Sequence, residues 1–249
     1  MAEHKFPTEV IDLPSLGKVY PKDSPLSDGK IELKYMTAKE EDILMSENLI
    51  KKGVVIDKLL DSLIVTKGIH QRDLVLGDKN AVLVAARILA YGPDYVAEVN
   101  NPNQPDQTVQ TTFDLSKCPF KNLNDDVDYS KGVFEFKTPV GKNDIKFKLL
   151  TGADEIKIDK ELKETAKYGL SSDITTRLRH TIVEVDGESS SEAIASFSQN
   201  ILARDSIALR NYISEITPDI ELTQEVEIGG ETVSVTIPLT VGFFWPQSV

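Results

Sequence analysis

The residues that could do chemistry in this chain are mostly acids, and one run of them contains Asp125, Asp126 and Asp128. Carboxylate oxygens bind Ca²⁺, but the EF-hand loop also needs a glycine at its sixth position and a glutamate at its twelfth. Counted from Asp126, those two positions are Lys131 and Lys137. The run therefore predicts a hydrated connecting segment, with an adventitious cation as the alternative.

Phosphate-binding and nucleophilic motifs are also missing. Gly141-Lys142 is followed by Asn143 instead of Ser or Thr, and the preceding glycine, Gly132, lies too far upstream for a P-loop. The chain has neither a Gly-x-Ser-x-Gly nucleophile elbow nor a His-Glu-x-x-His zinc pair. The sequence therefore predicts no catalytic residue and no cofactor.

The single cysteine, Cys118, excludes an intramolecular disulfide and a zinc site built from the cysteines of one chain. It is expected to be a free thiol. Carboxylates such as Asp154 and Glu155 could still converge as a general acid and base, although their spacing does not indicate it. An enzyme with motif-free carboxylate chemistry remains the alternative, and it predicts perturbed pKa values for these acids.

The net charge of the chain indicates which classes of partner it can bind. The 249 residues carry a formal net charge of −12, and affinity for nucleic acid rests on Lys and Arg neutralising phosphates. An acidic surface also disfavours anionic membranes. The N-terminus has no apolar signal region, and the most apolar stretch, residues 81–91, is too short to span a bilayer and contains Arg87. The sequence predicts protein partners, without nucleic acid or membrane.

The segments that position these residues form an internal sequence repeat, because similar patterns occur in the same order in both halves of the chain. Residues 31–41 align without a gap with residues 145–155: each segment alternates apolar and polar residues and then reaches a Thr followed three residues later by an acid. That pattern predicts a strand followed by a helix with a capping box, Thr37 with Glu40 and Thr151 with Asp154. Further matches follow in the same order, namely 14–18 with 139–142, 56–65 with 174–183, 78–91 with 205–216, and 108–116 with 232–240.

This order predicts an α+β fold of two tandem, internally duplicated lobes, each containing a strand, helices and a β-hairpin. Gly229-Gly230 is expected at the tip of the second hairpin, and residues 100–107 are expected to form a longer loop in the first. The predicted domains are an extended N-terminal docking segment, a first lobe, an acidic linker, a second lobe and an aromatic C-terminal tail: residues 1–30, 31–116, 117–132, 133–240 and 241–249.

Two segments are candidates for partner docking. The N-terminal one is apolar but interrupted by prolines and a glycine, so it is expected to be extended; its candidate residues are Leu13, Pro14, Leu16 and Tyr20. The alternative is that this segment packs along its own domain.

The C-terminal candidates are Phe243, Phe244, Trp245 and Pro246. Adjacent residues of an extended chain point to opposite sides, so three consecutive aromatic rings do not easily face one core. Interfaces favour such rings as anchors, whereas the alternative is that they cover the last strand of the second lobe. The docking hypothesis predicts that a chain lacking residues 243–249 folds but does not join its complex.

An ordered set of short motifs resembles the baseplate hub and hub-assembly proteins of T-even-type contractile-tailed phages. The resemblance extends over roughly residues 11–246 and rests on residues 13–21, 36–41, 73–78, 86–92, 149–155 and 243–246. Some relatives carry Cys-x-x-Cys pairs suited to zinc; the corresponding residues here are 101–104 and 224–227, which contain no cysteine, so zinc is not carried over.

The resemblance implies a structural or assembly role in the tail baseplate of the virion, without catalysis or cofactor, in a protein made in the cytoplasm of the infected bacterium. Its partners would be other baseplate hub or tail proteins in a multi-subunit assembly. A permanent virion subunit is favoured over a transient assembly factor. A generic adaptor or chaperone outside phage biology is the other alternative.

Overall fold

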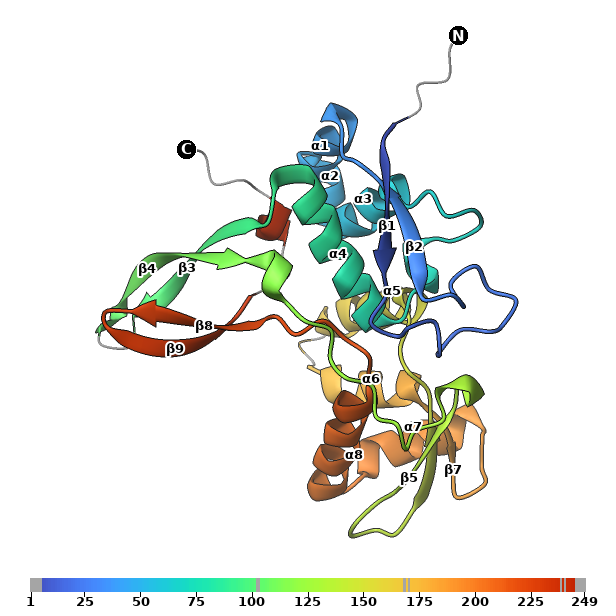
Figure 1. The fold of residues 1–249 in the computed structure, drawn as a ribbon. Coiled ribbons are helices and arrows are strands. Elements are labelled where there is room, and N and C mark those ends of the chain that lie inside the picture. The colour runs from blue at the N-terminus through green and yellow to red at the C-terminus, as the bar shows by residue number, and fades with distance from the viewer. Residues whose placement is uncertain are drawn as a thin grey trace.

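The computed structural model describes residues 6–101, 104–167, 169, 171–237, 239 and 241–244. The first half begins with an antiparallel pair of strands and continues through helices to a β-hairpin (Figure 1). Its elements are β1 (Thr8–Asp12), β2 (Lys30–Lys34), α1 (Ala38–Leu44), α2 (Glu47–Lys52), α3 (Val55–Leu63), η1 (Gln71–Asp73), α4 (Leu76–Tyr91), β3 (Asp94–Asn101) and β4 (Gln104–Asp114).

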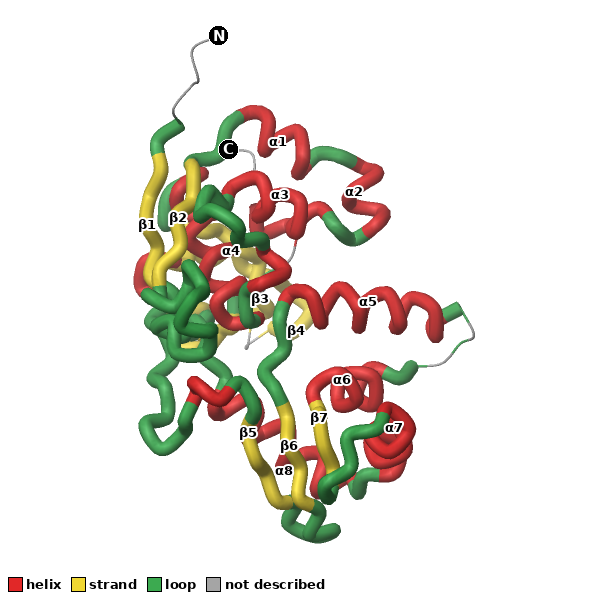
Figure 2. The backbone as a smooth tube through the Cα atoms, turned by 90° about the vertical axis from the view of Figure 1, so that its right-hand side faces the viewer, coloured by secondary structure: helices red, strands yellow, loops and turns green. Residues whose placement is uncertain are grey.

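The second half follows the same order, with a three-stranded antiparallel sheet in place of the first pair (Figure 2). After two short helical turns, η2 (Leu115–Lys117) and η3 (Tyr129–Lys131), its elements are β5 (Phe134–Lys137), β6 (Asp144–Phe147), α5 (Gly152–Ala166), α6 (Asp173–Thr181), β7 (Ile182–Val185), α7 (Ser191–Asn200), α8 (Ala203–Ile216), β8 (Thr223–Ile228), β9 (Glu231–Thr236) and η4 (Val241–Phe244).

The fold class expected from the sequence, α+β, is confirmed: helices combine with small antiparallel sheets. The tight turn at Gly229-Gly230 is present, since Ile228 pairs with Glu231. The long loop expected over residues 100–107 is wrong, because β3 continues to Asn101 and β4 starts at Gln104, with a register shift at Asn100/Asn101. The hydrogen-bonding potential of the backbone favours continued pairing over an open loop there.

Each half contains the same buried carboxylate at the start of a helix. In α1 the Glu40 carboxylate accepts hydrogen bonds from the Lys34 ammonium (2.8 Å), the Thr37 N–H (3.0 Å), the Thr37 hydroxyl (2.6 Å) and the Ser62 hydroxyl (2.7 Å). In α5 the Asp154 carboxylate accepts from Lys148 (2.7 Å) and from the Thr151 N–H (3.1 Å). Both predicted capping boxes are therefore present.

The Glu40 cluster predicts an acid-sensitive fold. Burial alone would raise the pKa of Glu40, but the hydrogen bonds from Lys34, Thr37 and Ser62 outweigh it and lower the pKa from 4.5 to about 2. The ionised form is thus favoured in the folded protein. Its contribution, about 3 kcal/mol at neutral pH, is complete above pH 4.5 and is lost as the pH falls from 4.5 towards 2.

Urea unfolding between pH 7 and pH 2 measures this contribution. Glu40→Gln is expected to lower the free energy of unfolding at pH 7 and to flatten its fall below pH 4.5. Glu41→Gln, on the exposed side of the same helix, is the matched control. An acid limb that is equally steep in both variants would contradict the assignment.

A second correspondence lies at the start of the long helices α4 and α8. Asp78 in the first turn of α4 accepts from the Ser15 N–H (2.9 Å) and hydroxyl (2.6 Å). Asp205, at the same place in α8, accepts from the N–H groups of Val140 and Gly141, both at 2.8 Å. Each helix therefore holds the Pro-containing loop that precedes the corresponding β-strand.

The two hydrophobic cores do not divide the chain as the sequence predicts. The hairpin β8–β9 comes from the second half, yet it lies against the β3–β4 hairpin, and together they form an arm that projects from the lobes (Figure 1). Ile220 and Ile237 beside this hairpin belong to the first core, as do Phe243 and Phe244. Hydrophobic burial between the two hairpins thus joins the halves.

The segment expected as an acidic linker, residues 117–132, is attached along much of its length. The Lys121 N–H donates to the Asp219 carbonyl at 2.8 Å, and Phe120 forms a β-bridge with Ile220. Tyr129 is buried in the second core and its hydroxyl donates to the Ile216 carbonyl at 3.0 Å. The acids of the segment, by contrast, are exposed, as the sequence indicated.

Candidate docking surfaces

The N-terminal loop after β1 presents Leu16 to solvent in an unusual backbone conformation. Leu16 has φ = 51° and Gly17 has φ = 76°, so two successive residues adopt the left-handed region. A Cβ at position 17 would lie 2.2 Å from the Ser27 carbonyl oxygen, which explains the glycine there. A leucine in this region is disfavoured, and the Leu16 side chain is nevertheless 56% exposed.

The buried Asp78 carboxylate holds this loop in place. Besides its two bonds from Ser15, it accepts from the Tyr20 hydroxyl at 2.6 Å, and that hydroxyl accepts from the Val75 N–H at 3.1 Å. Burial raises the pKa of Asp78, while the hydrogen bonds from Ser15 and Tyr20 act in the opposite direction. Burial and the adjacent Asp78 also raise the pKa of Tyr20. The loop is therefore anchored at both ends to one side chain of α4.

The four N-terminal candidates have different surroundings. Leu13 and Pro14 are buried within the first lobe, which is the alternative that the sequence left open for this segment. Tyr20 is half-buried and packs against both hydrophobic cores. Leu16 is the one of the four whose side chain is largely exposed. Partner docking by this loop stays a prediction, and Leu16 is the residue that could carry it.

The C-terminal rings pack inside the protein. Phe243 and Phe244 are each 1% exposed; their rings meet edge to face at a centroid distance of 5.5 Å, and Phe243 lies 5.0 Å from the Tyr95 ring on β3. Arg87 of α4 donates from Nε to the Phe243 carbonyl at 3.1 Å. Trp245 and Pro246 lie outside the described residues. The rings therefore complete the first core, and Val235 of β9, the last strand of the second half, packs against the same core.

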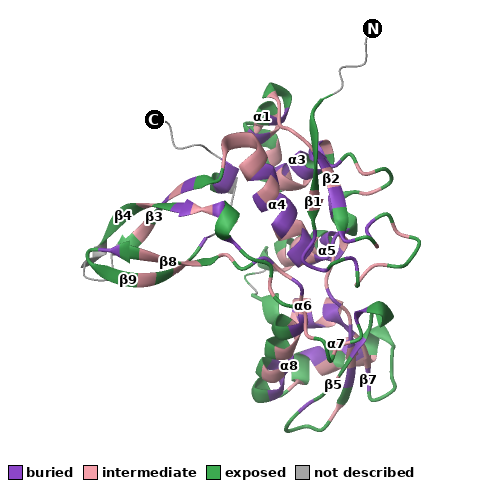
Figure 3. Ribbon diagram, viewed as in Figure 1, coloured by how far each residue is buried: buried purple, intermediate pink, exposed green. Residues whose placement is uncertain are grey.

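Sequence reasoning did not find the arm as a surface, although it predicted both hairpins. An open groove of about 410 Å³ runs between β3 and β9. Its apolar lining consists of Ala97, Val99, Phe113, Val233, Val235 and Ile237. Much of the arm is exposed or half-buried, in contrast to the buried face of α4 (Figure 3). Arg87 is the one residue whose position in the sequence could have indicated the base of the arm. A buried arginine within an apolar helix needs hydrogen-bond acceptors, and Arg87 donates to three backbone carbonyls there.

The acids that could have carried catalysis have structural partners. The pKa of Asp154 is lowered, since the bonds from Lys148 and Thr151 outweigh burial, and Glu155 forms a two-point ion pair with Arg177 at 3.0 and 3.1 Å. Asp128 accepts from Ser130 at the start of η3. Among the described residues, no group of three or more His, Cys, Asp or Glu is placed to hold a metal ion. Cys118 is a buried free thiol whose sulfur accepts a hydrogen bond from Gln224 Nε2 at 3.2 Å.

Helices in the described part of the chain are too short or too polar to span a bilayer. Rigidly anchored loops and exposed apolar side chains are features of a protein that other proteins bind. Comparison with known protein families identifies the class as a structural protein of a phage tail. Residues 7–245 match the family model described as T4 bacteriophage base plate protein, and the chain belongs to this family. It is thus a phage baseplate protein, and its partners are other baseplate or tail proteins. Comparison with curated proteins and with solved structures gave no match.

Proposed function

We propose that this protein is a component of the baseplate hub, or of its assembly, and that it acts through protein–protein contacts without catalysis. The observation that carries the proposal is Leu16, an exposed apolar side chain fixed on a left-handed backbone by Asp78. The nucleic-acid, membrane and cofactor classes have no support in the charge, the helices or the described acid clusters.

The energetics of the loop support a docking role. A left-handed backbone costs a leucine about 1–2 kcal/mol, and exposure of the side chain gains nothing in the free chain. Neither feature helps the protein to fold, so both are explained if the side chain is buried in a partner. Backbone strain that the surrounding structure holds in place is typical of functional sites.

Leu16→Asn tests this proposal, because asparagine tolerates the left-handed conformation and removes the apolar anchor. We expect an unchanged or slightly higher free energy of unfolding, together with a large loss of infectious particles when the variant replaces the native protein during infection. Ile174→Asn, an exposed apolar residue on α6, is the matched control. Normal particle yield with Leu16→Asn would overturn the proposed role of the loop.

The choice between a permanent subunit and an assembly factor needs a separate measurement. We favour a permanent subunit of the virion. Quantitative mass spectrometry of purified virions is expected to detect the protein in a fixed ratio to other baseplate proteins. Its absence from virions, with particle yield still dependent on it, would indicate a transient assembly factor made and used in the host cytoplasm.

The two lobes fit this role if they derive from one duplicated unit, because a duplication supplies similar faces at a fixed separation. The matched capping boxes and the matched aspartates Asp78 and Asp205 support the duplication. So does strand pairing, since the bridge of Leu33 with Ile64 corresponds to the pairing of Phe147 with Ile182.

A further inference from the structure

The two halves of the chain are joined by backbone hydrogen bonds of the kind that pair two antiparallel strands. Val75 and Thr151 form an isolated antiparallel bridge. The Leu76 N–H donates to the Leu150 carbonyl at 3.1 Å, and the Gly152 N–H donates to the Leu74 carbonyl at 2.9 Å. The segment before α4 in the first half thus binds the segment before α5 in the second.

Helix α5 extends this contact along the first lobe. Its N-terminal end meets η1, where a Cβ at position 152 would lie 2.6 Å from the Gln71 carbonyl oxygen. Near its other end, Lys163 donates to the Lys52 carbonyl of α2 at 3.2 Å. Figure 2 shows α5 lying between the helices of the first lobe and α6 of the second. The two halves therefore meet through different surfaces, in a head-to-tail manner.

Each of these two surfaces has a counterpart in the other half, because the capping boxes and the aspartates at the start of the long helices recur in both halves. The counterpart of Leu150–Gly152 with α5 is residues 36–38 with α1 and α2, here called the head face. The counterpart of residues 74–76 before α4 is residues 201–203 before α8, which with the first two turns of α8 is called the tail face. In the described structure, neither face forms backbone hydrogen bonds with the other lobe as its counterpart does. The head face does contact α5 at one point, where Lys163 donates to the Lys52 carbonyl of α2.

The open faces show what a contact of this kind would bury. Val75, between the halves, is 5% exposed, whereas its counterpart Leu202 on the tail face is 51% exposed, and Ile207 on the next turn of α8 is exposed to the same extent. On the head face Met45 is exposed. An apolar position that is covered in one half and open in the other indicates a missing neighbour.

Backbone N–H and C=O groups on the two open faces also lack the partners that their counterparts have. Among the described residues, the Met36 carbonyl and the Ala38 N–H make no hydrogen bond within the protein, and neither do the Ile201 carbonyl and the Ala203 N–H. Their counterparts are the four groups that join the halves. Two matching donor–acceptor pairs are therefore available, one on each open face.

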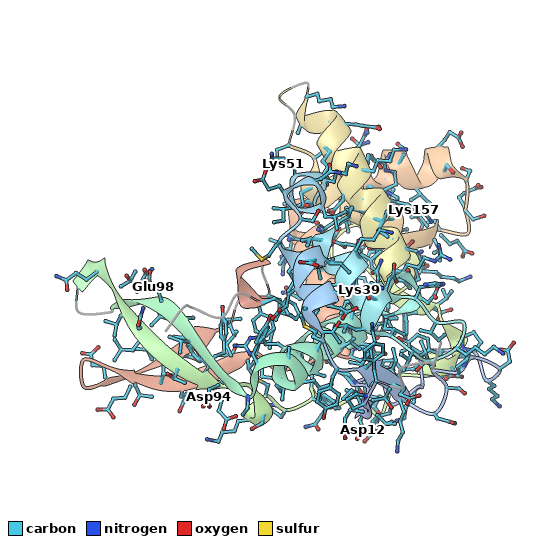
Figure 4. All side chains as sticks on the ribbon, turned by 90° about the horizontal axis from the view of Figure 1, so that it is seen from above. Asp12, Lys39, Lys51, Asp94, Glu98 and Lys157 are labelled. Atoms are coloured by element: carbon cyan, nitrogen blue, oxygen red, sulfur yellow. The ribbon has the colours of Figure 1, made fainter. Side chains whose placement is uncertain are left out.

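The exposed charges are basic on the first turns of α8 and of both signs on α1 and α2. Arg204 and Arg210 are exposed on α8, while Glu41 and Asp42 are exposed on the first turns of α1. Lys39 on α1 and Lys51 on α2, labelled in Figure 4, are exposed as well.

We propose that the head face of one copy of this protein binds the tail face of a second copy, and so repeats between chains the contact that joins the halves within a chain. Such a heterologous contact forms a ring if its rotation closes and a filament if it does not. Ala38 stands where the close contact has Gly152, so the backbones approach less closely between copies than within one. The contact between copies is therefore the weaker one, and association depends on concentration.

A mixing experiment with the full-length chain tests this proposal. Leu202→Glu blocks the tail face, and Ala38→Arg blocks the head face; both positions are exposed, so both variants are expected to unfold in urea like the native protein. We expect sedimentation velocity to show association of the native protein as its concentration rises to about 1 mM, which detects contacts with a Kd of that order. Each variant alone is expected to stay at its monomer mass of 27.6 kDa.

The mixture of the two variants distinguishes the proposed contact from any symmetric one. It retains one intact face of each kind, so it should form dimers of twice 27.6 kDa and stop there. Val10→Glu, at a residue 58% exposed on β1, should associate like the native protein. Ile207→Glu replaces Leu202→Glu if the latter does not fold. A native protein that stays monomeric, a variant that associates alone, or a mixture that stays monomeric overturns the proposal.

Discussion

Phe243→Ala is expected to lower the free energy of unfolding by about 3–5 kcal/mol, the range for removing a buried aromatic ring from a core. The ring is 1% exposed and lies between the Tyr95 ring and the Phe244 ring. Its removal leaves a cavity at the base of the arm, where the last turn of the described chain meets α4 and β3. Urea unfolding followed by fluorescence and circular dichroism measures the change.

Phe120→Ala is the matched control, because that ring is partly exposed and its loss should cost under about 1 kcal/mol. Phe243→Leu should cost less than Phe243→Ala, since it retains most of the apolar volume. Equal stability of Phe243→Ala and the native protein would contradict the packing described here.

This expectation reverses the one drawn from the sequence for the C-terminus. A chain without residues 243–249 loses both buried rings, so it should be unstable, and its failure to assemble would report unfolding. The aromatic sequence predicts an extended segment, in which successive residues alternate between opposite sides. The structure forms a short helical turn, η4, and η4 places both rings in the first core.

Local features were the most predictable part of the fold. Residues close together in the sequence determine these features. They are the capping boxes at Thr37 and Thr151, the hairpin turn at Gly229-Gly230, and the long helices α4 and α8. Such signals depend on hydrogen bonds between near neighbours in sequence, and these are readable from spacing alone.

Contacts between the halves could not be predicted in the same way. The alignment of the hairpins indicated that each half has one, but not that β8–β9 would pack on β3–β4 or that Leu13 would be buried while Leu16 is exposed. Both outcomes depend on long-range packing. Gly77 illustrates this, because a Cβ there would lie 1.6 Å from the Pro218 carbonyl oxygen of the other half.

The position of the docking loop could be predicted from its composition, but the conformation of the loop could not. Prolines and a glycine predicted an irregular segment, whereas the structure shows a loop fixed by a distant acid, Asp78. No spacing rule connects residue 15 with residue 78. The repeat did carry a hint, since Asp78 and Asp205 occupy matching positions in the two aligned helices.

Asp78→Ala is expected to destabilise the protein by about 3–5 kcal/mol, since each buried donor left without an acceptor costs about 1–3 kcal/mol. Three donors lose their acceptor, namely the Ser15 N–H, the Ser15 hydroxyl and the Tyr20 hydroxyl. Buried donors without a partner account for most of the cost. Asp78→Asn should cost less, because the two hydroxyl groups can turn to accept from its amide.

Asp205→Ala separates the effect on the docking loop from general destabilisation, since it removes the matching anchor in the other lobe. It should cost about 1–3 kcal/mol, because two N–H groups lose their acceptor. Hydrogen exchange at the Ser15 amide should accelerate strongly in Asp78→Ala and little in Asp205→Ala. If the Ser15 amide exchanges equally fast in both variants, Asp78 does not hold the loop, and the rigid presentation of Leu16 has no structural basis.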